Sequence, residues 1–218
     1  MRSWAEESGH AYRWLDDELF TPVPVALRLK TRYQSVVTTD LARLLQLERA
    51  LVEGYSPVFW FDADVLVVAP ERFSFTGPGH ALGRELWFQA TPRGAPKRYW
   101  RIHNAFLAFE RSDPVLPFYR LAAERVLERF EGQAMVPQLL GPKLLSALGN
   151  LAQLTVQEDA AMLPPLVAES LLSADGCLFE RWVEEHIVPP AAINLCASLQ
   201  TDETTGAALV RRLLQRFD

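Results

Sequence analysis

A continuous apolar run, Pro57-Val58-Phe59-Trp60-Phe61, leads directly into two carboxylates, Asp62 and Asp64. Short runs rich in β-branched and aromatic residues are typical of a strand buried on both faces, as in a parallel or mixed sheet covered by helices. In open sheets of that kind, ligands collect beyond the carboxyl ends of the strands. Asp62-Ala63-Asp64, called the acidic step below, is therefore the first candidate for a functional site.

Helical and strand patterns alternate along the rest of the chain. We expect a helix over about 40–53, with Thr38 to Asp40 as its N-cap and Gly54 as its stop. Pro114 opens a second helix that runs to about Phe130. Further strands are expected at 65–68, 86–90, 102–109 and 154–156, and further helices at 139–148, 179–186 and 206–217. This alternation predicts an α/β layered sheet, and the length of 218 residues suits one domain over 1–218.

Composition narrows the possible partners. Hydrophobic residues make up 49% of the chain, and the formal net charge is -5, so the chain can bury a core but has no basic field for nucleic acid. The two cysteines, Cys177 and Cys196, lack the spacing of a zinc or redox motif. No apolar run is long enough to span a bilayer, and the N-terminus lacks a leader-like apolar segment. We expect a cytoplasmic protein with no transmembrane segment.

Two carboxylates at positions i and i+2, where a strand turns into a loop, can both face one divalent cation. Hard oxygen ligands suit Mg²⁺ or Mn²⁺, which take one or two carboxylates and complete their shell with phosphates and water. Such a site recruits a diphosphate and stabilises the charge that it gains as a leaving group. The spacing alone fits two loop-capping acids equally well.

A second enzyme class shares this local pattern. Haloacid-dehalogenase-like phosphatases end a strand in Asp-x-Asp-x, followed by Thr or Val and then Leu or Val; the first Asp is the nucleophile and the second a general acid. Asp62 to Leu66 is compatible with that step, with Lys143 and Glu158-Asp159 as the later partners. The fit elsewhere is poor, because that motif normally opens the first strand of its fold.

Several short motifs occur in one order along the chain: Ser3-Trp4, Thr39-Asp40-Leu41-Ala42-Arg43, Trp60-Phe61-Asp62-Ala63-Asp64-Val65, Asn104-Ala105-Phe106 and Gly141-Pro142. In this order they resemble the glycosyltransferase family with a DXD sugar-binding region, similar to the α-mannosyltransferase and capsular-polysaccharide type. The resemblance covers about residues 3–165.

The resemblance implies a GT-A-like fold, with a mixed, mainly parallel sheet flanked by helices. It implies a Rossmann-like nucleotide-sugar half over about 1–110 and an acceptor-binding, helical part over about 111–218. The implied reaction moves a sugar from a UDP-sugar or GDP-mannose to a glycan or other hydroxyl acceptor, assisted by Mn²⁺ or Mg²⁺ and with retention of configuration.

The same resemblance assigns roles to individual residues. Asp62 and Asp64 are the catalytic candidates, and both are candidate metal ligands. Asp40, Arg43 and Asn104 are expected beside Asp62 in the donor site. The alternatives are an N-cap role for Asp40, a solvated helix face for Arg43 and a backbone-bonded sheet position for Asn104.

Two departures from the family pattern are visible. Family members commonly carry a metal-binding His near the C-terminus, where this chain has Asn194, a candidate ligand whose amide oxygen binds a hard cation more weakly. Members also have a first strand ahead of the Ser-Trp step at which this sequence begins. We expect that another segment replaces the strand, that the reading frame is truncated, or that the nucleotide site is degenerate. A non-catalytic nucleotide-sugar-binding homologue is therefore the alternative.

Overall fold

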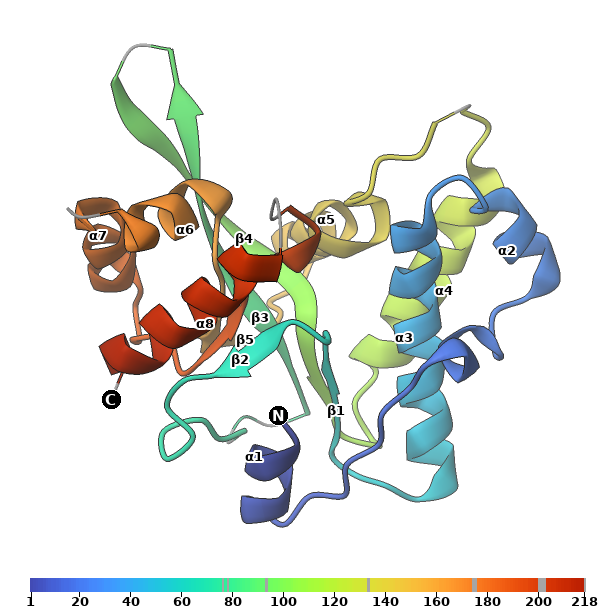
Figure 1. The fold of residues 1–218 in the computed structure, drawn as a ribbon. Coiled ribbons are helices and arrows are strands. Elements are labelled where there is room, and N and C mark those ends of the chain that lie inside the picture. The colour runs from blue at the N-terminus through green and yellow to red at the C-terminus, as the bar shows by residue number, and fades with distance from the viewer. Residues whose placement is uncertain are drawn as a thin grey trace.

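A hairpin of two long strands forms the centre of the fold (Figure 1). The strands are β3 (His80–Thr91) and β4 (Gly94–Phe109), and Gly94, with a φ of 125°, stands at the turn between them. This computed structural model describes residues 1–218 except 76, 78, 93, 133, 174, 175, 200–202 and 218, and only the backbone at 198, 203 and 204.

Over the described residues, six strands form one sheet in the order β1-β4-β3-β5-β6-β2. The four further strands are β1 (Val58–Phe61), β2 (Val65–Val67), β5 (Val156–Met162) and β6 (Ala192–Asn194). The β1/β4, β3/β4 and β2/β6 pairs are antiparallel, whereas β3/β5 and β5/β6 are parallel.

The expected α/β sheet flanked by helices is confirmed, but the expectation that it is mainly parallel is wrong. Parallel neighbours need a crossover of a dozen or more residues. The chain instead turns directly from β3 into β4, so the longest strand pair in the sheet is antiparallel. The strand predicted at 57–61 is also an edge strand paired with one neighbour, not a strand enclosed within a parallel sheet.

The two edge strands, β1 and β2, are joined by only the three residues of the acidic step (Figure 1). Six strands in a flat sheet would hold their edges about 24 Å apart, because neighbouring strands lie about 4.8 Å apart. The chain from Phe61 to Val65 reaches about 14 Å at most. The sheet therefore curls until its two edges meet at the acidic step.

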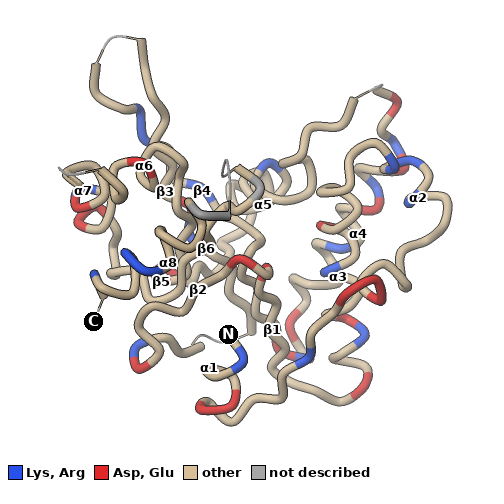
Figure 2. Tube along the Cα trace, in the orientation of Figure 1, with Lys and Arg blue, Asp and Glu red and all other residues tan. Residues whose placement is uncertain are grey.

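Helices cover the sheet mainly on one face. Alternate residues of a strand point to opposite faces, and Leu82 and Leu107 pack against helices, whereas Ala81 and Ala108 face the other side. The helical segments are α1 (Arg2–Glu7), η1 (Asp17–Phe20), α2 (Val25–Lys30), α3 (Ser35–Glu53), α4 (Val115–Arg129), η2 (Leu139–Lys143), α5 (Leu144–Leu151), α6 (Pro165–Leu172), α7 (Cys177–Glu185), η3 (Ala197–Leu199) and α8 (Glu203–Phe217). Acidic and basic residues are interspersed along them (Figure 2).

Local signals place some helix ends correctly. α3 ends at Gly54, whose φ of 110° suits a glycine, and α4 begins after Pro114, where the Asp113 carboxylate accepts the N–H of Val115 at 2.8 Å. The predicted start of α3 is wrong, because the helix begins at Ser35 and Asp40 lies buried inside it. In the part of the chain that is described, no helix is long and apolar enough to cross a membrane.

Candidate functional site

Asp62 directly follows β1 and is the point where this strand meets α3. Its backbone N–H donates to Ala105 O on β4 at 2.9 Å, which continues the β1/β4 ladder by one residue. Its carboxylate accepts the indole N–H of Trp60 at 2.7 Å and lies 3.1 Å from Nη1 of Arg43. Strand, indole and guanidinium therefore fix the carboxylate in one orientation.

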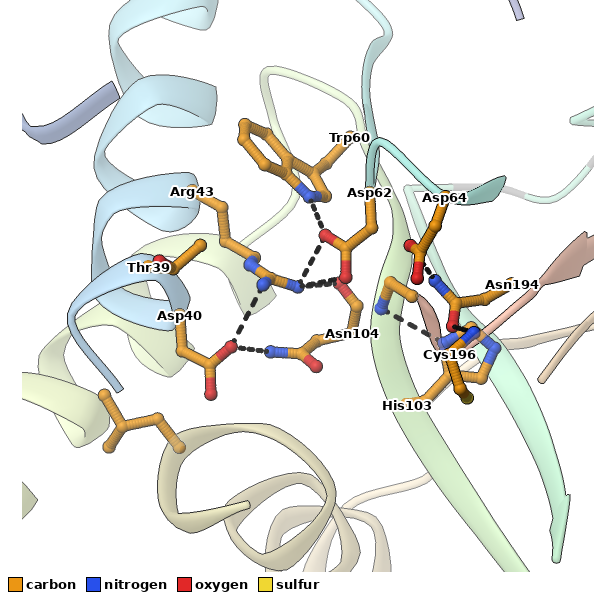
Figure 3. Close-up of polar contacts among 12 residues, drawn as sticks. Thr39, Asp40, Arg43, Trp60, Asp62, Asp64, His103, Asn104, Asn194 and Cys196 are labelled. Carbon is orange, nitrogen blue, oxygen red and sulfur yellow. Dashed lines mark hydrogen bonds and ion pairs between the residues drawn. The ribbon is translucent and has the colours of Figure 1, made fainter. Parts of the chain in front are cut away.

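Arg43 is the centre of a buried network (Figure 3). Its Nη2 lies 3.1 Å from Oδ1 of Asp40, and its Nη1 donates to Asn104 O at 2.6 Å as well as reaching Asp62. The Asn104 side chain donates to the same Asp40 oxygen at 2.9 Å. One arginine thus joins an acid on its own helix to an acid on the neighbouring strand.

The carboxylate of Asp40 lies deeper than that of Asp62. Burial raises the pKa of Asp40 to about 6, against the attraction of Arg43 and the hydrogen bond from Asn104. Close packing also fixes Asn104, because a Cβ added at Gly141 would lie 2.8 Å from Asn104 Oδ1. Asp40 and Asn104 therefore act as supports that hold Arg43 against the acidic step.

A bulge in β4 makes this network possible. The β3/β4 register shifts between Leu82, which faces Leu107, and Gly83, which faces His103, so residues 104–106 have no partner in β3. Released from the β3 ladder, Asn104 O accepts from Arg43, while Ala105 O still accepts from Asp62 on the β1 side of the strand. The Asn-Ala-Phe motif is thus the segment by which β4 contacts the site.

His103 fills the space that the bulge opens. Its Nε2 lies 3.0 Å from Ala160 O, and its Nδ1 accepts the N–H of Ala105 at 3.1 Å. Burial lowers the pKa of His103 to about 4, so the ring is neutral with its proton on Nε2. The ring lies where a Cβ of residue 83 would be, 2.1 Å from its Cε1, so this position requires glycine.

Asp64 is held separately, at the start of β2 (Figure 3). Its Oδ1 accepts from Nδ2 of Asn194 at 2.6 Å and its Oδ2 accepts from the N–H of Ala197 at 2.8 Å. Because a backbone N–H can only donate, the bond from Cys196 N to Asn194 Oδ1 at 3.0 Å sets the orientation of the amide. Asn194 therefore presents its donor group to Asp64, and its role as a direct metal ligand stays a prediction.

A cavity of about 1000 Å³ borders the acidic step. Its wall includes Arg43 and the edge of β1, together with residues 9–15, which run past that edge. Asp62 and Asp64 both belong to the lining. This volume is at the upper end of the usual range for small-molecule sites.

Two carboxylates, Asp62 and Asp64, are the acidic side chains at this place that could bind a metal ion. Across the described ranges, no group of three or more His, Cys, Asp or Glu residues lies close enough to hold a metal ion. Two carboxylates match what Mg²⁺ takes when phosphates and water supply its remaining ligands. Each oxygen of Asp64 accepts one hydrogen bond and has a lone pair left for a cation. The residues present therefore fit a cation that arrives with a phosphate ligand.

The predicted site residues form two groups. Asp40, Arg43, Asp62 and Asn104 come together in one network, and Asp64 and Asn194 in another, with Ala63 between the two. The sequence interpretation missed Trp60, His103 and Trp14, which respectively orient Asp62, fill the bulge and line the cavity. Trp60 had a usable signal, since it lies on β1 two residues before Asp62.

Comparisons with protein-family models, with curated proteins and with solved structures gave no match to this chain.

Proposed function

We propose that this protein transfers a sugar from a nucleoside diphosphate sugar to a hydroxyl acceptor, with the donor bound in the cavity beside the acidic step. One observation carries the proposal: a cavity of about 1000 Å³ has Arg43, Asp62 and Asp64 together in its lining. A buried cation and two oriented carboxylates beside one apolar wall suit a ligand with an anionic and an aromatic part. The GT-A-like fold is part of the same proposal.

The roles follow from the contacts. Arg43 contacts Asp62 from the interior of the protein and orients its carboxylate, so that Asp62 accepts hydrogen bonds from the hydroxyl groups of the donor. Asp64, oriented by Asn194, and Asp62 would hold Mg²⁺ or Mn²⁺, which supplies Lewis-acid stabilisation of the diphosphate. The bond from the anomeric carbon to the diphosphate oxygen breaks and a bond to the acceptor oxygen forms. The acceptor proton passes to the departing diphosphate, in keeping with the retention that the resemblance implies.

A metal-dependent thermal shift tests this proposal. We expect UDP-sugars or GDP-mannose to raise the Tm in the presence of Mn²⁺, by roughly 5–10 °C at about 100 times Kd. The rise should vanish in Asp64→Asn and persist in Glu128→Gln, a half-exposed acid on α4. No rise with any nucleotide sugar would rule the proposal out.

One observation favours the alternative of nucleotide-sugar binding without transfer. Both oxygens of Asp64 already accept hydrogen bonds from the protein, which weakens its hold on a cation. A Tm rise that does not depend on Mn²⁺, with no transfer to acceptors or to water, would support that alternative. The phosphatase alternative needs Glu158 as a later partner of the acidic step, but Glu158 is already ion-paired with Arg84. If the protein were such a phosphatase, it would hydrolyse phosphomonoesters, and Asp62→Asn would abolish that activity.

A further inference from the structure

The outer edge of β1 carries unpaired backbone groups. Asp62 N bonds to Ala105 O, and the antiparallel register pairs Trp60 with Leu107. Hydrogen-bonded residues alternate along an antiparallel strand, so the N–H and C=O groups of Phe59 and Phe61 point away from β4. Nowhere in the described ranges does a backbone or side-chain group bond to them.

This edge faces the cavity, whose lining includes both Phe59 and Phe61. The lining also includes Tyr12 and Trp14 from the segment at residues 9–15. Trp14 is 60% exposed, and within the described part of the chain its ring stacks on no other aromatic ring. The cavity therefore offers a row of backbone donors and acceptors beside a free aromatic surface.

We propose that the open edge of β1 binds the base of the nucleotide donor through the backbone groups of Phe59 and Phe61. This inference rests on the proposed function and assigns the part of the cavity that reads the nucleotide. Uracil and guanine each carry a ring N–H beside a carbonyl oxygen, which complements the N–H and C=O of one strand residue. Trp14 supplies a surface for stacking, which every base accepts.

A planar base suits this edge better than an added strand. Two residues expose their backbone groups here, fewer than most paired strands use. The edge also leads along β1 to Arg43, Asp62 and Asp64, where the charged diphosphate would lie. A base at Phe59 and a diphosphate at the acidic step place the two ends of one ligand in the same cavity.

Titration of ¹⁵N-labelled protein tests the assignment. We expect UDP or GDP to shift the amide protons of Phe59 and Phe61, and ribose 5-phosphate at the same concentration to leave them in place. Phe118, an exposed residue on α4, is the internal control. Nucleotide shifts at Arg43 and Asp64 alone would overturn the base assignment and leave the proposed function standing. No shift with any nucleotide would overturn both.

A pair of variants isolates the backbone group. Phe59→Pro removes one outward N–H and no bond of the β1/β4 ladder, and proline is tolerated on edge strands. Phe59→Ala keeps the N–H and loses the same ring. We expect Phe59→Pro to bind UDP or GDP about 3- to 10-fold more weakly than Phe59→Ala. Equal affinities, or exchange protection of both amides without nucleotide because a partner strand covers the edge, would overturn the inference.

Discussion

The guanidinium of Arg43 reaches Asp62 at 3.1 Å from the interior of the protein. The Arg43 side chain is only 5% exposed, and the Asp62 side chain is 27% exposed. The carboxylate that a ligand would meet in the cavity is thus positioned by a cation that water scarcely reaches. The site depends on the interior of α3 as much as on the surface of β1.

Replacing Arg43 tests this dependence. Arg43→Met leaves Asp40 buried without its cation, and we expect the free energy of unfolding to fall by about 3–5 kcal/mol. Chemical denaturation measures it. Arg49→Met, which removes a half-exposed ion pair with Glu53 on the same helix, should cost about 0–1 kcal/mol. Equal losses in the two variants would contradict a buried network at Arg43.

We expect Asn194 to contribute to stability and to ligand binding through the hydrogen bond that it donates to Asp64. Asn194→Ala removes the 2.6 Å bond to Asp64 and leaves Cys196 N without its acceptor. We expect a loss of about 1–3 kcal/mol in the free energy of unfolding and a weaker Mn²⁺-dependent shift with nucleotide sugar. Asn150→Ala, on an exposed position of α5, serves as the matched control and should change stability by less than about 0.5 kcal/mol.

Glu85 should make stability depend on pH. Burial raises its pKa to about 7 from 4.5, with Arg101 3.5 Å away. The folded state holds this proton more tightly, so its stabilising effect is complete below pH 4.5 and is lost as the pH rises through 7. Wild type should therefore lose about 3 kcal/mol relative to Glu85→Gln between pH 4.5 and 8.

Denaturation of both proteins across that range measures the difference. The comparison cancels the opposite effect of His103, whose lowered pKa makes stability fall as the pH drops from 6.5 to 4. Parallel pH profiles for wild type and Glu85→Gln would show that folding does not raise the pKa of Glu85.

The contact between His103 and Gly83 calls for a double-mutant cycle. Gly83→Ala would place a Cβ 2.1 Å from the imidazole, so we expect a loss of more than about 3 kcal/mol or failure to fold. In a His103→Ala background the added methyl should cost much less, because the ring is gone. Additive losses measured by denaturation would mean that the clash lies elsewhere.

Much of the local structure could be predicted from the sequence, because its signals are local. Gly54 and Pro114 mark helix ends through their own backbone preferences. The start of α3 was predicted wrongly because Asp is a residue type favoured at helix N-caps. Asp40 instead accepts a hydrogen bond from Asn104, a residue 64 positions away. A pattern of neighbouring residues carries no signal for such a distant partner.

The order of strands in the sheet is harder to predict from a sequence pattern. Strand patterns at 57–61 and 65–68 were visible, yet nothing in them shows that β1 and β2 lie at opposite edges of the sheet. The orientation of side chains in the candidate site could not be predicted from the sequence either. The resemblance named Asp62, Asp64 and Asn194 together, but only the contact with Cys196 shows which end of the amide faces Asp64.

Because the two edges of the sheet meet at the acidic step, the geometry of this step is coupled to the curvature of the sheet. Asp62 follows β1 and Asp64 precedes β2, so the spacing of their carboxylates depends on how tightly the whole sheet is rolled. The affinity of a ligand that binds both carboxylates would therefore depend on the curvature of the sheet, including strands that the ligand does not contact. Substitutions at the bulge in β4, which bonds to both Arg43 and Asp62, should therefore change the affinity for such a ligand, as substitutions in the cavity do.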